Sequence, residues 1–405
     1  MKKPAIYYGW FVVAACFIVT LTLGETFWSF GVFFKPLENE FGWSRAVTSS
    51  GYTAFTIGYA ISTVVSGRLA DRYSPRPIIF VTALISGLGI ALCSQVNNIQ
   101  QLCIFLFIAG LGGGATMSVP SATVQRWFHN RRKAGLALAI VISGVGVGAL
   151  IFAPLINFLI LSYGWRNAYL IVGILFFISI AIAAFVIKSS PAESRAIPGV
   201  GVDMTKEQSD QGWTISKAIV TPAFISVVFL NLATVLGFQV VTVHLIPYAT
   251  DIGISATAAA AALGLMGGFS IPGRLTSGFL AEKVGWQRIM ALSFLGMALS
   301  LSILLFLRNT WMMYGFVMFY GICHGARATT QFGILGKFFG MHSLGVLIGI
   351  MMGASHSLGS FAPYIAGFIF DTTGNYLTAF ILVMVVLLGA SFISATMKAP
   401  SVTPE

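Results

Sequence analysis

The sequence predicts an all-α membrane protein with twelve transmembrane helices arranged as two six-helix bundles. Of its 405 residues, 57% are hydrophobic and 9% are charged, and the mean hydropathy is +0.88, whereas a soluble domain carries about 25% charged residues. Twelve apolar stretches are long enough to cross a bilayer at roughly 20 residues per helix, and the two halves of the chain repeat one another. The composition excludes a cytosolic globular enzyme, a disordered chain and a secreted disulfide scaffold.

The first half contains six of these stretches. The first, residues 8–34, follows two lysines as a signal peptide would, but no small-residue cleavage site ends it, so we expect a retained helix. The others cover residues 46–69, 77–96, 100–124, 134–160 and 166–187. Together they define an N-terminal six-helix bundle, residues 1–187.

A single long polar stretch, residues 188–217, follows this bundle. It is mixed in charge and contains Pro191 and Pro198, which predicts a flexible cytoplasmic linker. The second half then supplies the stretches 218–246, 256–281, 287–307, 311–335, 345–370 and 376–397, which define a C-terminal six-helix bundle, residues 218–405.

The net charge of +11 is explained by membrane topology. When the amino terminus is placed in the cytoplasm, most of the lysines and arginines fall on the cytoplasmic side, which predicts a multi-pass plasma-membrane protein with both termini inside. We therefore expect contact with membrane lipid and no nucleic-acid partner. The four cysteines all lie in apolar stretches without metal-site or redox spacing, and we interpret them as packing residues.

The internal repeat is visible in short motifs. Residues 67–72 (GRLADR) return as residues 278–283 (GFLAEK), and residues 126–128 (RWF) return at the same offset as residues 337–339 (KFF). Because each half contains an even number of spans, both halves have the same orientation. The repeat is therefore parallel, about a pseudo-two-fold axis along the membrane normal.

These motifs resemble a known superfamily. Residues 67–76 (GRLADRYSPR) look like the signature loop between helices 2 and 3 of the major facilitator superfamily. Residues 8–10, residues 29–34, residues 41–46 and the pair Gly273-Arg274 are similar to monocarboxylate porters and oxalate:formate antiporters. The resemblance implies alternating access around a site between the two halves, near the middle of the bilayer.

The signature loop and its second copy are the predicted gate. An acid placed between arginines at a helix end can pair with neighbouring helix termini and hold one state of the transporter. The gating candidates are Arg68, Asp71, Arg72, Arg76 and Glu282. The alternative is that these residues are only solvated charges on the cytoplasmic side.

Arg274 is the first candidate for substrate binding. A guanidinium inside a membrane span is costly unless it faces water, a partner or a substrate, and its planar fork matches a carboxylate. In the families that the chain resembles, the arginine at this place on helix 8, four residues before a glycine as with Gly278 here, binds the substrate carboxylate. The alternative is a purely structural ion pair.

Arg327 is a second embedded cation, and Glu25 is the only embedded acid of the predicted spans. If Glu25 is ionised, one net positive charge remains, which suits a monocarboxylate. If Glu25 is protonated, both arginines are uncompensated and a dicarboxylate becomes plausible. The sequence leaves open whether Glu25 pairs with Arg274 or with Arg327.

Proton coupling needs a titratable group inside the membrane. The animal monocarboxylate porters that the chain resembles carry an aspartate four residues before the helix-8 arginine, where this chain has Ser270. We therefore name Glu25, His324 and His356 as coupling candidates, since histidine changes charge near neutral pH.

Other polar and aromatic residues complete the candidate binding site. His324 and Gln331 each lie one helical turn from Arg327. The full substrate-binding set is Arg274, Arg327, His356, Trp28 and Gln331. For the neutral polar side chains of these spans, including Asn231, Gln239 and His244, the alternative is an ordinary hydrogen bond between helices.

The sequence thus predicts a secondary transporter of small monocarboxylates such as lactate or pyruvate, working by proton symport. An organic-anion exchanger, such as an oxalate:formate antiporter, is the first alternative, and a non-transporting carboxylate sensor is a remote one. We expect no catalytic residues, no metal and no cofactor, because the chain contains no nucleotide-binding loop, GxSxG or HExxH motif. A proton gradient or a counter-substrate would supply the energy, and a monomer would be the functional unit.

Overall fold

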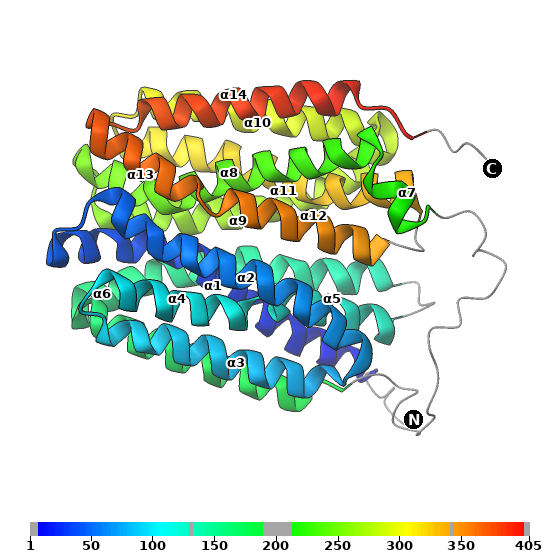
Figure 1. Ribbon diagram of the computed structural model, residues 1–405, viewed down its shortest axis with the longest axis horizontal. Coiled ribbons are helices and arrows are strands. Elements are labelled where there is room, and N and C mark those ends of the chain that lie inside the picture. The colour runs from blue at the N-terminus through cyan, green and yellow to red at the C-terminus, as the bar shows by residue number, and fades with distance from the viewer. Residues whose placement is uncertain (1–6, 129–132, 189–212, 341–343, 401–405) are drawn as a thin grey trace, which may run out of the picture. The chain divides into compact units, whose positions relative to one another are not determined.

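The computed structural model describes residues 7–128, 133–188, 213–340 and 344–400, and every regular element in these ranges is helical (Figure 1). The chain divides into two compact units, Met1–Ile197 and Pro198–Glu405. The predicted all-α fold is therefore confirmed, and we describe each unit separately.

The first unit is built from long apolar helices with short connections. Ser44 accepts a hydrogen bond from the Val47 amide at the start of the second helix, and Asn98 caps the fourth helix through the Gln101 amide. The elements are α1 (Gly9–Phe41), α2 (Arg45–Arg72), α3 (Pro75–Leu92), the 3₁₀ turn η1 (Cys93–Gln95), α4 (Ile99–Gly113), α5 (Ala115–Trp127) and α6 (Ala134–Val186).

Helix α6 contains two of the predicted spans. Its 53 residues would extend about 80 Å as one helix, well over twice the thickness of the hydrocarbon core of a bilayer, about 30 Å. Gly164 interrupts it with φ 79° and ψ 159°, a conformation that glycine adopts without a steric penalty. The chain therefore turns at Gly164, within the short connection predicted between residues 160 and 166.

The second unit has the same succession of helices. Thr221, Ser255 and Asn309 each accept a hydrogen bond from a first-turn amide and so cap α8, α9 and α11. The elements are α7 (Ile215–Ile219), α8 (Pro222–Asp251), α9 (Ala256–Val284), α10 (Trp286–Leu305), α11 (Thr310–Phe339), α12 (Leu344–Gly359), α13 (Ala362–Thr373) and α14 (Leu377–Thr396).

Two predicted spans are divided in the structure. The span 100–124 is separated into α4 and α5 at Gly114, and the span 345–370 into α12 and α13. Pro363 lies in the first turn of α13, where its missing amide hydrogen costs no bond. When these pairs are joined and α6 is divided at Gly164, the described helices supply six spans in each unit. Length and hydropathy alone select nine candidate spanning helices in the described ranges, and the more polar α2 and α11 are not among them.

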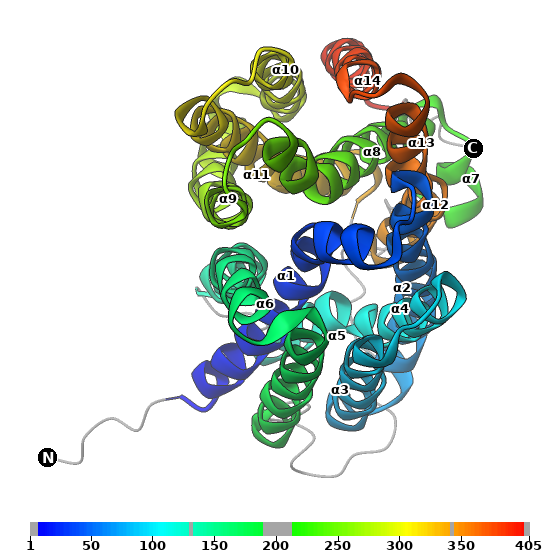
Figure 2. The same ribbon diagram turned by 90° about the vertical axis from the view of Figure 1, so that its left-hand side faces the viewer.

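The two units use the same helix pairs internally. In the first, α1 packs on α6, α2 on α4, and α3 on α6; in the second, α8 packs on α12 and α13, α9 on α11, and α10 on α14 (Figure 2). This repeated pairing is the structural counterpart of the sequence repeat.

Glycines bring α9 and α11 into close contact. A Cβ atom at Gly273 would collide with the Ile322 carbonyl oxygen, and one at Gly325 would collide with the Ser270 carbonyl oxygen. Small residues allow helix backbones to approach in this way. The contact fixes the two helices that carry Arg274 and Arg327.

Candidate functional site

One face of α11 carries the polar residues of the candidate site. Tyr320, His324, Arg327 and Gln331 follow at spacings of four, three and four residues, so they lie in one row along the helix. The side chains of Tyr320 and Gln331 are buried, and Arg327 is only 8% exposed. The row therefore brings a positive charge into the interior of the second unit.

Arg327 is buried beside neutral partners. Its Nη1 donates a hydrogen bond to Oε1 of Gln331, and Nε2 of Gln331 donates in turn to Sδ of Met351 on α12 at 2.8 Å. Within the described residues, Nε of Arg327 has no hydrogen-bond partner. The guanidinium is held in place by an amide, and its charge is not neutralised by that contact.

Arg274 brings a second guanidinium close to the first. It is half-buried on α9, and its carbonyl oxygen accepts a hydrogen bond from Oγ1 of Thr329 on α11 at 3.2 Å. The charges of Arg274 and Arg327 interact electrostatically. In the described part of the second unit, the acidic residues Asp251, Glu282 and Asp371 are all exposed and lie near helix ends. Two like charges thus lie near one another, and an anion beside them would be stabilised.

Two histidines lie near the arginines. The His324 ring stacks with that of Phe238 on α8, at 5.0 Å between ring centroids, and is nearly parallel to that of Tyr320, at 6.3 Å. His356 lies on α12, where its Nδ1 donates to the Met352 carbonyl oxygen at 3.0 Å. Both histidines interact electrostatically with Arg327. A protonated histidine here would add a third positive charge, which only an anion would offset.

Tyr320 and Gln239 have buried polar atoms without hydrogen-bond partners in the described ranges. These atoms are the hydroxyl of Tyr320 and both polar atoms of the Gln239 side chain. A Cβ atom at Gly237 would lie 3.3 Å from the Tyr320 hydroxyl, so this hydroxyl faces α8 at Gly237. Gln239, two residues further on, projects from another side of α8. Buried polar groups are nearly always bonded, and each of these atoms is therefore available to a polar ligand. Sequence reasoning missed Tyr320, although its position one turn before His324 on the same face was a usable signal.

The remaining candidates lie on other helices. Trp28 is on α1 in the first unit, where it is 3% exposed. Glu25 is also on α1, but its side chain lies outside the described residues, so its pairing with an arginine stays a prediction. His244 makes ordinary hydrogen bonds between helices. Its Nε2 donates to the Pro363 carbonyl at 2.8 Å, and its Nδ1 accepts from the Tyr376 hydroxyl at 2.9 Å.

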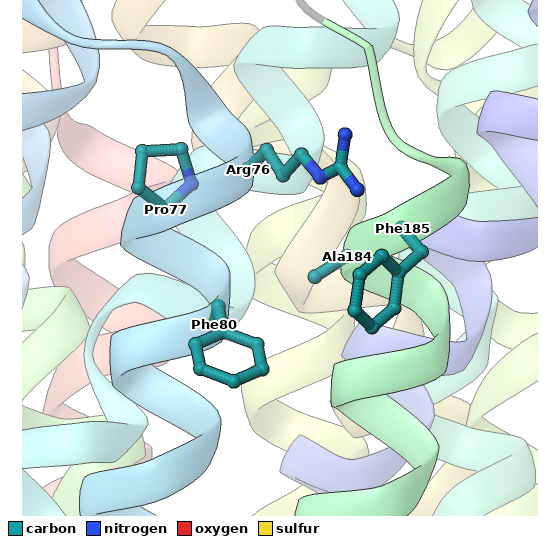
Figure 3. A pocket seen from close by; sticks show the side chains of 5 residues that line it. All are labelled: Arg76, Pro77, Phe80, Ala184 and Phe185. Atoms are coloured by element: carbon teal, nitrogen blue, oxygen red, sulfur yellow. The ribbon is translucent and has the colours of Figure 1, made fainter.

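The gating candidates are only partly described. Arg68, Asp71 and Arg72 lie near the end of α2, but their side chains fall outside the described residues. Arg76 is exposed in the first turn of α3, with its guanidinium carbon 5.0 Å from the centroid of the Phe185 ring (Figure 3). Glu282 is exposed near the end of α9. The predicted latch between these residues stays a prediction.

Apolar spans in two units and a buried positive cluster together define a membrane transporter of the major facilitator type, and comparison with known proteins agrees. The sequence profile of the Major Facilitator Superfamily matches residues 16–363 and 227–404. This chain belongs to that superfamily.

The proteins that it resembles in sequence and in structure include transporters of several kinds. The chain is 26% identical to monocarboxylate transporter 13 of Bos taurus, covering 100% of this chain and 94% of the relative, and 27% identical to monocarboxylate transporter 11 of Homo sapiens, covering 95% and 82%. The solved structure of a D-xylose–proton symporter aligns with a TM-score of 0.77 at 15% identity, covering 96% of this chain and 98% of that one. A bacterial homologue of the lysosomal transporter Spinster aligns with a TM-score of 0.71 at 16% identity, covering 98% and 97%. The predicted resemblance to monocarboxylate porters is confirmed, and the two structures support the fold alone.

Proposed function

We propose that this protein is a secondary transporter of small monocarboxylates such as lactate or pyruvate, working by alternating access in the plasma membrane with both termini in the cytoplasm. The observation that carries the proposal is Arg327, a buried guanidinium whose hydrogen bond goes to a neutral amide oxygen and which lies near a second arginine. The names of the relatives support the same substrate class.

The electrostatics favour an anionic substrate. Burying an ion without a counter-charge costs several kcal/mol, and a carboxylate that accepts hydrogen bonds from one or both guanidinium groups would offset this cost. Arg274 is proposed to bind the carboxylate, and Arg327, held by Gln331, is proposed to bind its second oxygen or to add positive potential.

The polar atoms without partners favour a second oxygen on the substrate. The Tyr320 hydroxyl is proposed to supply a hydrogen bond to the 2-hydroxyl of lactate or the 2-keto oxygen of pyruvate, and the Gln239 amide is the second candidate for that bond. Buried groups of this kind cost about 1–3 kcal/mol each when they stay unbonded, so a ligand that satisfies them gains affinity over one that does not.

The proton would be carried by a histidine or by Glu25. Ser270 donates its hydroxyl to the Gly267 carbonyl at 2.6 Å and cannot titrate near neutral pH. His324 and His356 both lie near Arg327, and a substrate anion bound there would interact favourably with a positive charge on either ring. This linkage is the physical basis of symport.

One observation favours a second candidate, an exchanger. Arg274 and Arg327 lie near one another, and a dianion such as oxalate would interact favourably with both charges. The exchanger would then alternate between a dicarboxylate and a monocarboxylate.

Uptake of radiolabelled lactate and oxalate into liposomes that contain the purified protein separates these proposals. Lactate accumulation driven by an inward proton gradient, with no internal substrate, would support symport. Flux of either acid only when unlabelled acid is present inside would support exchange and exclude the histidines as obligatory proton carriers. No protein-dependent flux of either acid under both conditions would overturn the proposal.

A further inference from the structure

We propose that the groove between the start of α3 and the end of α6 binds one anionic phospholipid, with the lipid phosphate on Arg76 and the upper part of an acyl chain against Phe80 and Phe185. The groove belongs to the first unit, whereas the arginine cluster belongs to the second. The proposal does not depend on the identity of the transported substrate.

The groove has one charged residue at its mouth and apolar walls. Its lining consists of Arg76, Pro77, Phe80, Ala184 and Phe185. Figure 3 shows the Arg76 side chain reaching from α3 toward α6, with the Phe185 ring beside its end and the Phe80 ring further along the same gap. The guanidinium carbon of Arg76 lies 5.0 Å from the centroid of the Phe185 ring, and the Arg76 side chain is exposed. The planar fork of a guanidinium matches two phosphate oxygens.

The polar end of the groove favours a negative ligand. The first turn of α3 contains no acidic residue, and the partial positive charge of the helix N-terminus adds to that of Arg76. No lining residue is acidic. An anion is therefore attracted, whereas the cationic headgroup of a zwitterionic lipid gains less.

The apolar end of the groove favours a ligand with a long chain. The ring of Phe80 lies 6.0 Å from that of Phe177 and 6.5 Å from that of Phe185, both edge-on. Exposed aliphatic side chains continue along both helices away from Arg76, namely Val81, Leu84 and Leu88 on α3 and Ile178 and Ile182 on α6. In a membrane protein such a surface faces acyl chains. A free phosphate would use only the mouth of the groove, whereas a phospholipid uses its whole length.

The test is lipid binding to the purified full-length protein. Native mass spectrometry in detergent micelles would measure the dissociation constant of the first bound phosphatidylglycerol, and of phosphatidylcholine with the same acyl chains, for the parent and for Arg76→Gln. Arg288→Gln is the matched control, because Arg288 is exposed in the first turn of α10, which occupies the place of α3 in the second unit. Phe185→Ala, at a side chain that is 63% exposed, removes the apolar wall and keeps the charge.

We expect the parent to bind phosphatidylglycerol more tightly than phosphatidylcholine. Arg76→Gln should raise the dissociation constant of phosphatidylglycerol about fivefold, to that of phosphatidylcholine. Phe185→Ala should weaken both lipids, and Arg288→Gln should change neither. Equal affinity of the parent for the two lipids would overturn the proposal. So would an Arg76→Gln protein that elutes as a single species on size exclusion and binds phosphatidylglycerol as tightly as the parent.

Discussion

Replacing Arg327 by methionine removes a buried charge at similar side-chain volume, and we expect it to make the substrate-free protein more stable. The guanidinium is 8% exposed, bonds to the neutral Gln331 oxygen, has no partner for Nε in the described residues and lies near the like charge of Arg274. A charge in this position is retained for binding and works against folding.

The expected gain follows from two opposing terms. The desolvation penalty of a buried ion is several kcal/mol, and the hydrogen bond from Arg327 to Gln331 returns about 1.5–3 kcal/mol. Replacing buried ionic groups by apolar ones of similar volume stabilises proteins by about 1–4 kcal/mol when the charge is poorly compensated. Arg327→Met leaves the buried Gln331 oxygen without its donor, so the stabilisation of this single variant should lie toward the lower end of that range. The double variant Arg327→Met, Gln331→Leu should be stabilised by more.

Thermal unfolding in detergent, with and without lactate, measures the effect. Without lactate, Arg327→Met should melt at a higher temperature than the parent, and Gln331→Leu at a lower one, because this second variant leaves the guanidinium without its amide acceptor. Lactate should raise the melting temperature of the parent and raise that of Arg327→Met by less, because Arg274 remains. If Arg327→Met melts lower than the parent, as Gln331→Leu does, the charge is compensated in the empty protein and the reasoning is wrong.

Three further predictions concern packing, a buried hydrogen-bond pair and substrate selectivity. Gly325→Ala should destabilise the protein by about 1–3 kcal/mol, since its methyl would meet the Ser270 carbonyl. Gly315→Ala on the same helix, with no atom within 4 Å, should stabilise the protein by about 0.5–1 kcal/mol. Thermal unfolding that gives the two variants the same stability would contradict the close contact at Gly325. His244→Phe should lower the free energy of unfolding about twice as much as Tyr376→Phe, because it breaks two buried hydrogen bonds instead of one, and an equal loss would show that only the tyrosine bond matters. Tyr320→Phe should raise the KM for lactate about threefold to tenfold. The KM for propionate, which lacks the 2-hydroxyl, should stay nearly unchanged. An equal rise of both KM values would show that Tyr320 does not recognise the 2-hydroxyl.

Much of the fold could be predicted because the bilayer imposes a simple rule on sequence. A span needs about 20 apolar residues, and the stretch ending at residue 160 and the one starting at residue 166 reproduce the turn at Gly164. The breaks at Gly114 and before Pro363 could not be placed in the same way, because the chain stays apolar through both. Hydropathy averages over a window and does not register a change in backbone direction.

The row along α11 could also be read from spacing, since residues three and four apart share a face of a helix. The partners of that row could not. Met351 reaches Gln331 from α12, and Phe238 reaches His324 from α8. Such contacts depend on how helices distant in the sequence pack, which a single sequence does not encode locally.

The role proposed for Tyr320 could not be predicted from the sequence. In the sequence it is one of 12 tyrosines in an aromatic-rich chain, and nothing marks it as polar in function. Its significance comes from burial of the hydroxyl without a partner, which is a property of the folded unit.

Uptake of labelled lactate by liposomes containing Arg274→Gln, beside the parent and Arg288→Gln, tests most directly whether the buried arginine cluster binds the substrate carboxylate. Removing one partner of a buried, hydrogen-bonded charge pair typically costs 2–5 kcal/mol, so we expect Arg274→Gln to lose about thirtyfold or more in kcat/KM. Arg288→Gln, at an exposed position outside the cluster, should transport like the parent. An Arg274→Gln protein that transports lactate as well as the parent would contradict carboxylate binding by this cluster.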